Sequence, residues 1–256
     1  MLKVQRLNMD NSWIIHIENT KILVDPWLFG EEVDYFPWFN RQWHRTPPVK
    51  PENLPDYDFC LITQKYPDHF HKETLSVIQP KKIVGPKSIR RFIKRLLPKT
   101  EFFGFDEDLS NVFDSGIDIK HIPTKRKIDP IYDALLLKGQ KKKVFMATHG
   151  FTLAVDQKDM ISNGLPVDLL ITPLNTYKLP AVLGGYVSPG LKSVEQLIQT
   201  IEPSFIAATH DEDKYAKGLV SKFAKITWAP IGSELKTNPI FKDIFLDIQD
   251  YQIHEL

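Results

Sequence analysis

Short apolar runs of strand length recur along most of this chain and alternate with stretches of helical periodicity. Residues 2–7, 12–17 and 21–24 are predicted to form three successive strands separated by turn residues. Amphipathic helices are predicted over residues 88–97 and 193–201. Further strands are predicted over residues 59–62, 82–84, 117–122, 134–138, 144–147, 167–171 and 205–208. Strands and helices that alternate in this way indicate an α/β domain built in layers.

Two later stretches complete the expected outline. Residues 174–190 contain several prolines and glycines and are expected to form a loop, whereas residues 213–223 are expected to be helical. The chain has 256 residues, of which 42% are hydrophobic, and this is enough for one large core. Because no low-complexity linker interrupts it, we expect a single domain over residues 1–256.

Composition narrows the classes of function. The net charge is +1 and no basic stripe is present, which argues against a nucleic-acid partner. A single cysteine, Cys60, rules out an internal disulfide framework. The N-terminus begins with a strand pattern instead of a signal peptide, and no apolar run approaches the length of a transmembrane segment. We therefore expect a soluble cytoplasmic protein.

Polar residues with metal-binding side chains follow three of the predicted strands. Asp68 and His69 come after the strand at 59–62, His149 follows the strand at 144–147, and His210 follows the strand at 205–208. Each alone has an ordinary explanation, such as a helix cap for Asp68 or a surface position for a histidine. Three strand ends that each carry a histidine favour a common metal site, because imidazole and carboxylate groups are ligands of zinc-like metals. His71, two residues beyond His69, is an additional candidate ligand.

An aromatic-rich stretch, residues 27–48, fits neither a helical nor a strand period. We expect an irregular loop that lies over the body of the domain. Its aromatic side chains either close the core or form the hydrophobic wall of a ligand pocket. His44 lies within this stretch, and the sequence leaves open whether His44 or His71 joins the site.

Four segments together resemble the metallo-β-lactamase fold superfamily, and the resemblance covers nearly the whole chain. The segments are Ile22–Leu28, Leu61–His69, Lys143–Gly150 and Thr209-His210. The resemblance is to the lactonase-like and phosphodiesterase-like branches, with a degenerate form of the H-x-H-x-D-H motif. It implies a four-layer αββα sandwich of two mixed β-sheets flanked by helices.

This sequence departs from the family pattern at one of the two metal positions. Gln64 and Tyr66 stand where the family has its first two histidines, and Arg126 or a neighbour stands for the third. The other position is retained, because the resemblance places Asp68, His69 and His210 on family ligands and His149 at the bridging aspartate. It therefore implies one metal ion, zinc or alternatively iron or manganese, held by one carboxylate and three imidazoles.

The activity implied by the resemblance is hydrolysis of an ester, lactone or phosphodiester bond in a small substrate that is anionic or partly hydrophobic. Asp68 contributes as the carboxylate at the metal. Tyr66 is expected to donate a hydrogen bond to a developing oxyanion. Arg126, or alternatively Lys125 or Lys127, is expected to hold an anionic group of the substrate or to stabilise developing negative charge. The alternative is a non-catalytic binding or scaffold member of the fold that holds a structural metal or none, because one metal position is lost.

Overall fold

The computed structural model describes residues 1–107, 109, 116–124, 133–151, 165–183, 185–211, 214–230 and 233–256. The chain divides into two compact units. Unit 1 comprises Met1–Ile119, Glu212–Lys222 and Asp250–Leu256, and unit 2 comprises Lys120–Asp211 and Phe223–Gln249. Strand β9 (Asp118–Ile122) and helix α5 (Leu219–Phe223) each run from one unit into the other.

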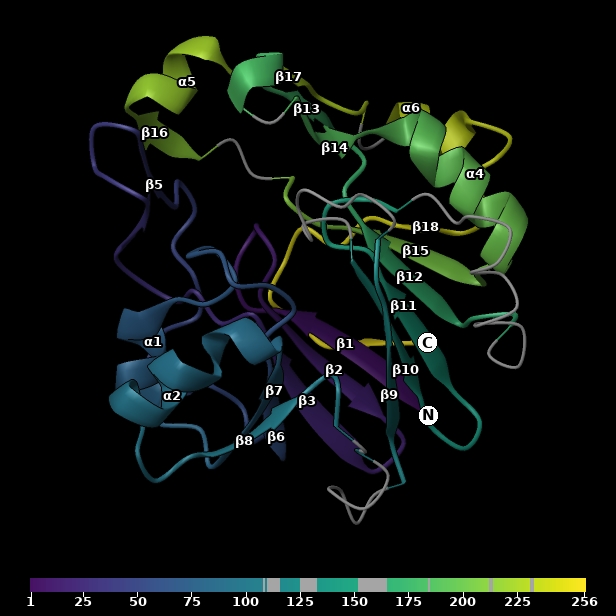
Figure 1. Ribbon diagram of the computed structural model, residues 1–256. Coiled ribbons are helices and arrows are strands. Elements are labelled where there is room, and N and C mark those ends of the chain that lie inside the picture. The colour runs from purple at the N-terminus through teal and green to yellow at the C-terminus, as the bar shows by residue number, and fades with distance from the viewer. Residues whose placement is uncertain are drawn as a thin grey trace. The chain divides into compact units, whose positions relative to one another are not determined.

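Unit 1 is built on a seven-stranded mixed sheet in the order β19-β1-β2-β3-β6-β7-β8. Its strands are β1 (Leu2–Arg6), β2 (Trp13–Ile17), β3 (Thr20–Val24), β6 (Phe59–Leu61), β7 (Lys82–Gly85), β8 (Glu101–Gly104) and β19 (His254–Glu255). From β19 to β3 neighbouring strands are antiparallel, whereas β3, β6, β7 and β8 are parallel. The two ends of the chain therefore meet in one edge pair, β1 with β19 (Figure 1).

Helices α1 (Lys72–Ile78) and α2 (Arg90–Leu96) cover one face of this sheet (Figure 1). Leu75 of α1 and Ile93 of α2 are buried in the same apolar cluster as Leu23, Cys60 and Ile83 of the strands. The three N-terminal strands, the strand at 82–84 and the helix at 88–97 were thus predicted correctly. The last of these opens with a 3₁₀ turn (Lys87–Ile89) before α2.

The aromatic stretch is not an irregular loop, and that prediction was wrong. Strands β4 (Glu31–Asp34) and β5 (Asn40–Trp43) form an antiparallel hairpin within it, and β16 (Tyr215–Lys217) adds a third strand beside β5. Three of the four residues of β4 are acidic and have little strand propensity of their own, which is why the sequence does not indicate this strand. Residues 213–223, expected to be helical, are divided in their described part between β16 and α5.

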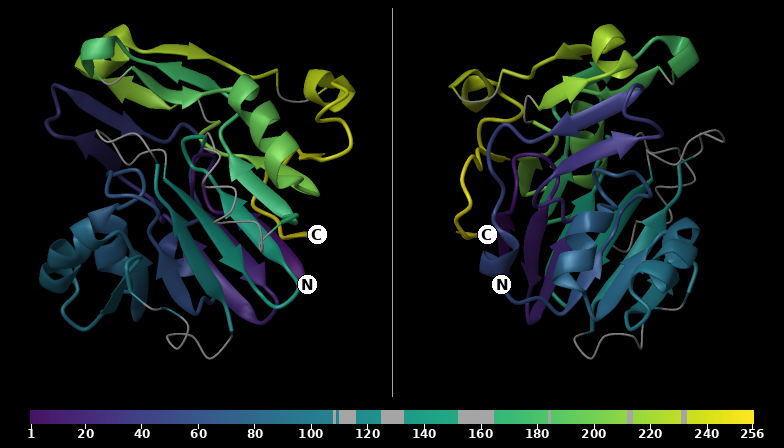
Figure 2. Two further views of the ribbon diagram at one scale, coloured as in Figure 1. Left: turned by 45° about the vertical axis from the view of Figure 1, so that its right-hand side comes forward. Right: turned by 90° about the vertical axis from the view of Figure 1, so that its left-hand side faces the viewer.

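Unit 2 contains a six-stranded sheet in the order β18-β15-β12-β11-β10-β9. Its remaining strands are β10 (Ala134–Lys138), β11 (Lys143–Met146), β12 (Leu169–Thr172), β15 (Phe205–Ala208) and β18 (Phe245–Leu246). Strands β11, β12, β15 and β18 are parallel, and β10 is antiparallel to β11. Helix α4 (Leu191–Ile201) packs on this sheet through Val194, Leu197 and Ile201 (Figure 2).

A smaller sheet in unit 2 corrects a second expectation. Residues 174–190 are not simply a loop, because β13 (Thr176–Lys178) pairs there with β14 (Tyr186–Pro189) and with β17 (Lys225–Thr227). A 3₁₀ turn (Ala181–Leu183) lies between β13 and β14, and α6 (Ser233–Thr237) follows β17. The observed class is therefore α/β with two large mixed sheets, as predicted. Among the described residues, no helix has the length and apolar character that crossing a membrane requires.

Candidate metal centre

The topology of unit 1 gathers polar residues at one edge of its sheet. Asp25 directly follows β3, and Thr63 follows β6, the parallel neighbour of β3. The turn between β1 and β2 reaches the same edge, because Trp13 at the start of β2 pairs with Val24 at the end of β3. The carboxyl ends of parallel strands are where α/β sheets bind ligands.

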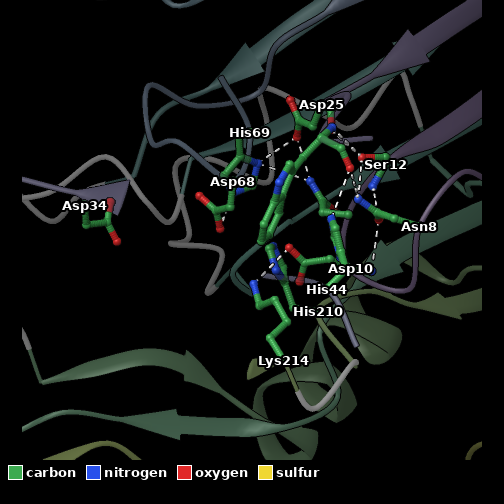
Figure 3. A network of polar contacts seen from close by, with 12 residues as sticks. Asn8, Asp10, Ser12, Asp25, Asp34, His44, Asp68, His69, His210 and Lys214 are labelled. Atoms are coloured by element: carbon green, nitrogen blue, oxygen red, sulfur yellow. Dashed lines mark hydrogen bonds and ion pairs between the residues drawn. The ribbon is translucent and has the colours of Figure 1, made fainter. Parts of the chain in front are cut away.

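Asp25 is the centre of a buried hydrogen-bond network at this edge (Figure 3). Its Oδ1 accepts from the backbone N–H of Thr63 at 2.7 Å. Its Oδ2 accepts from the Thr63 hydroxyl at 2.5 Å and from the Asn11 amide at 2.6 Å, and it lies 2.7 Å from Nδ1 of His69. Asp25 and His69 are fully buried. These donors satisfy both carboxylate oxygens, so Asp25 is held firmly in one orientation.

The contact with Asp25 determines which nitrogen of His69 is free for a ligand. Because Nδ1 donates to the Asp25 carboxylate, Nε2 is left on the opposite side of the ring, where it lies 3.6 Å from Oδ2 of Asp68. A histidine whose second nitrogen is fixed by a carboxylate is the usual arrangement for a metal ligand. The donor set of Asp68 and His69 therefore fits a metal ion.

Two carboxylates, those of Asp68 and Asp25, place negative charge next to His69. Burial lowers the pKa of His69, but the neighbouring charges of Asp68 and Asp25 outweigh burial and raise it to about 9. A bound cation would relieve the same excess of negative charge, with Nε2 deprotonated.

A lysine from a distant part of the chain joins this network. Nζ of Lys214 lies 2.9 Å from Oδ2 of buried Asp10 and 5.2 Å from the centre of the Trp27 ring. Burial lowers the Lys214 pKa, but Asp10, Asp68 and Glu32 together raise it above its usual value. Lys214 therefore remains a cation close to the carboxylates of unit 1 (Figure 3).

In unit 2 the same rule of strand ends brings two histidines together. His149 follows β11 and His210 follows β15, and both of these strands are parallel to β12, which lies between them. The two imidazole rings stack with their centres 4.8 Å apart and their planes at 20°. His210 has a positive φ of 51°, which is uncommon outside glycine, and its carbonyl accepts from the Asn175 side chain at 3.3 Å. A non-glycine residue held in this conformation is often functional.

The structure places the other candidate histidines in packing roles. His71 caps helix α1, because its Nδ1 accepts from the backbone N–H of Thr74 at 3.2 Å. Its Nε2 lies 3.2 Å from the carbonyl oxygen of Glu31. His44 packs against Trp27 with 3.9 Å between ring centres, and its Nε2 lies 3.1 Å from the Trp27 carbonyl oxygen. Within the described part of the chain, no group of side chains that could hold an ion includes His71 or His44.

Tyr66 and Arg126 are the remaining predicted site residues, and only Tyr66 lies in the described part of the chain. The carbonyl of Tyr66 accepts from the backbone N–H groups of His69 and Phe70, so Tyr66 starts the turn that carries His69. Gln64, at a position where the family has histidine, is buried beside this turn. Arg126 lies outside the described residues.

Sequence reasoning missed several residues that organise the site: Asn11, Asp25, Thr63, Asp10 and Lys214. Asp25 offered a signal, because a carboxylate directly after a buried strand and before Pro26 lies at a sheet edge. Lys214 offered none, because its partner Asp10 is 204 residues away.

Comparison with known proteins agrees with this fold. A metal-dependent hydrolase of the UPF0173 group from Pyrococcus abyssi (strain GE5 / Orsay) is 25% identical over 238 residues, which span 86% of this chain and 94% of that protein. An isothiocyanate hydrolase from Delia radicum gut bacteria superposes with a TM-score of 0.69 at 15% identity and covers 99% of both chains. A metal-dependent hydrolase candidate from Veillonella parvula DSM 2008 superposes with a TM-score of 0.68 at 17% identity, over 100% of this chain and 99% of that one.

The structural likenesses show the fold, and the sequence model shows the family. The model of the beta-lactamase superfamily domain matches residues 8–210, which include most strands of both large sheets and the residues Asp68, His69, His149 and His210. The resemblance in sequence is therefore confirmed, and the chain belongs to the beta-lactamase superfamily with the metallo-β-lactamase fold.

Proposed function

We propose that this protein is a metal-dependent hydrolase and that Asp68, His69, His149 and His210 bind one metal ion. The observation that carries the proposal is the contact of His69 Nδ1 with Asp25 at 2.7 Å, which leaves Nε2 beside Asp68. The stacked pair of His149 and His210 supplies two more imidazoles in unit 2. A relative that is named a metal-dependent hydrolase and matches over 94% of its length supports the activity.

The donor set favours zinc, with iron or manganese as alternatives, because three imidazoles and one carboxylate suit these metals. A metal ion held in this way supplies an activated water and polarises the bond to be cleaved. The protein's own part begins with Asp25, which fixes the tautomer of His69 and increases its basicity. Asp68, whose Oδ2 lies 3.6 Å from Nε2 of His69, would hold the ion together with this nitrogen and offset part of its charge.

We further propose roles for two residues near the substrate. Tyr66 donates a hydrogen bond to the oxygen on which negative charge develops, and Arg126 holds an anionic group of the substrate. The proposed substrates are small esters, lactones or phosphodiesters.

Metal content and hydrolysis test the proposal together. We expect elemental mass spectrometry of the purified protein to find about one ion per chain, and chelation to abolish cleavage of ester, lactone or phosphodiester substrates. His69→Ala and His210→Ala should each lose metal and activity. His16→Ala is the matched control, because His16 faces outward on β2, away from the ligands. A protein that holds no metal and hydrolyses none of these substrates would instead favour a non-catalytic member of the fold. Hydrolysis that survives both substitutions would contradict the proposed ligand set.

A further inference from the structure

Unit 1 contains a cavity of about 400 Å³ between the β4–β5 hairpin, the segment that carries Asp68, and the start of α2. Its wall combines apolar and charged side chains, among them Glu32, Val33, Phe70, Lys72, Ile89 and Phe92. Pro67, which directly precedes Asp68, also lines it. The volume is in the range of small-molecule sites.

Glu32 is the unusual member of this wall. It is only 2% exposed, because alternation along β4 turns it inward while Glu31 faces solvent. Its Oε2 is buried and has no hydrogen-bond partner among the described residues. A buried carboxyl oxygen without a partner is costly, and such a group in a native protein requires an explanation.

The neighbours of Glu32 make it a site for positive charge. Burial raises the pKa of Glu32 well above its usual range, and the charges of Asp68 and Asp34 raise it further. Lys214 acts in the opposite direction, but it is already bound to Asp10. The raised pKa means that the side chain of Glu32 alone favours its protonated form. A cationic group that donates to Glu32 would instead stabilise the carboxylate.

The aromatic part of the cavity already accommodates an ammonium group. The rings of Phe70 and Phe92 lie 6.5 Å apart, and Nζ of Lys72 lies 5.9 Å and 5.3 Å from their centres. Aromatic faces attract ammonium groups and apolar bodies alike. Because Lys72 already contacts these rings, they suit the apolar body of a ligand, whereas its positively charged end would lie at Glu32.

We infer that this cavity binds a primary ammonium group attached to an apolar body, with the ammonium donating to the carboxylate of Glu32. A metal ion fits less well, because no group of three or more His, Cys, Asp or Glu side chains within the described ranges that could hold an ion includes Glu32. That the bound molecule is the substrate rests on the proposed hydrolase function, whereas recognition of the ammonium by Glu32 does not.

Three probes of nearly equal shape and different charge test the inference: benzylammonium, benzyl alcohol and benzoate. Each is titrated into the full-length ¹⁵N-labelled protein at neutral pH, with zinc and after chelation, and followed by NMR chemical shifts. We expect benzylammonium to bind about tenfold more tightly than benzyl alcohol, because a hydrogen bond between charged groups is worth at least this factor.

Matched variants locate the effect. Glu32→Gln keeps the shape of the side chain and should bring the two dissociation constants to within about twofold of each other. Glu73→Gln removes a carboxylate from the exposed rim of the same cavity, where the side chain is 69% exposed, and should preserve the preference.

The inference is overturned if wild-type protein binds benzyl alcohol as tightly as benzylammonium, if benzoate binds most tightly, or if the preference survives Glu32→Gln. The wild-type comparison remains decisive even where a variant fails to fold. A preference for benzylammonium that persists after chelation supports the cavity site separately from hydrolysis, whereas a protein that holds no metal contradicts only the hydrolase.

Discussion

The two pairs of proposed ligands are held in different ways. In unit 1, His69 is fully buried and its Nδ1 lies within 3.1 Å of Asp25, Thr63 and Asn11. In unit 2, His149 and His210 stack on each other, and the backbone of His210 adopts a positive φ. One pair is oriented by a carboxylate network, and the other by ring stacking and an uncommon backbone conformation.

This difference separates stability from ligand binding. The network around Asp25 contributes to the fold of unit 1 whether or not an ion is bound, because its donors and acceptors satisfy one another. The pair in unit 2 is held by ring stacking and by the backbone of His210, so we expect it to depend more on a bound ion. We therefore expect substitutions in the Asp25 network to lower both the free energy of unfolding and the metal affinity. Substitutions of His149 or His210 should lower mainly the metal affinity.

The largest effect is expected for Asp25→Asn. The amide would direct an N–H group towards the donors of Thr63, Asn11 and His69, and a buried ion pair broken in this way costs about 3–5 kcal/mol. Metal affinity should fall by about 10–100-fold, because His69 loses the partner that orients it. Chemical denaturation and metal titration measure the two effects.

Asp58→Asn is the control for Asp25→Asn. Asp58 also accepts a backbone N–H across strands, from Lys21 at 2.7 Å, but it is exposed. Its substitution should change the unfolding free energy by less than about 1 kcal/mol. Equal losses in the two variants would contradict the central role of Asp25.

The second prediction contrasts His149→Ala with His71→Ala. Without metal, His149→Ala should unfold near the wild-type temperature, but the stabilisation that added metal gives to the wild type should disappear. His71→Ala should show the reverse, because loss of the helix cap costs about 1 kcal/mol while the metal response remains. Thermal unfolding with and without zinc measures both, and a His71→Ala variant that loses the metal response would make His71 a ligand.

The same contrast explains which parts of the site the sequence could predict. Asp68, His69, His149 and His210 could be proposed as ligands because each comes within a few residues of the end of a short apolar run, and a strand end is a local signal. Many of the strands could be predicted for the same reason, because the alternation of apolar and polar side chains is a pattern within a few neighbouring residues.

Residues that act through distant pairing were not predictable in this way. Asp25 becomes the partner of His69 only because β3 lies parallel to β6. Lys214, which directly precedes β16, reaches Asp10 from a segment that pairs with β5 far away in the sequence. The hairpin of β4 and β5 likewise lies in an aromatic stretch that has no strand period. His71 has the residue type of a ligand, but its position at the start of α1 gives it a capping role that composition alone does not distinguish.

The smallest effect concerns Asp34, whose pKa is raised to about 6, first by burial and then by the charge of Asp68. This pKa lies above the value near 3.8 in the unfolded chain, so between about pH 4 and pH 6 the folded state binds more protons than the unfolded state. The contribution of Asp34 to the stability of the fold is therefore lost as pH rises through this window. Asp34→Asn keeps an acceptor for Asn40 and should therefore gain stability relative to the wild type as pH rises, by on the order of 1 kcal/mol at pH 8.

Asp106→Asn should show the opposite sign in the same experiment. The hydrogen bond from Lys87 lowers the pKa of Asp106, so its contribution is present at neutral pH and is lost as pH falls. Denaturation of both variants between pH 4 and pH 8 measures the difference.

With metal bound, the cation offsets the charge of Asp68, so the gain from Asp34→Asn should shrink. If metal leaves the stability gain of Asp34→Asn unchanged, the ion does not lie near Asp68. That result would contradict the proposal that Asp68 is a ligand.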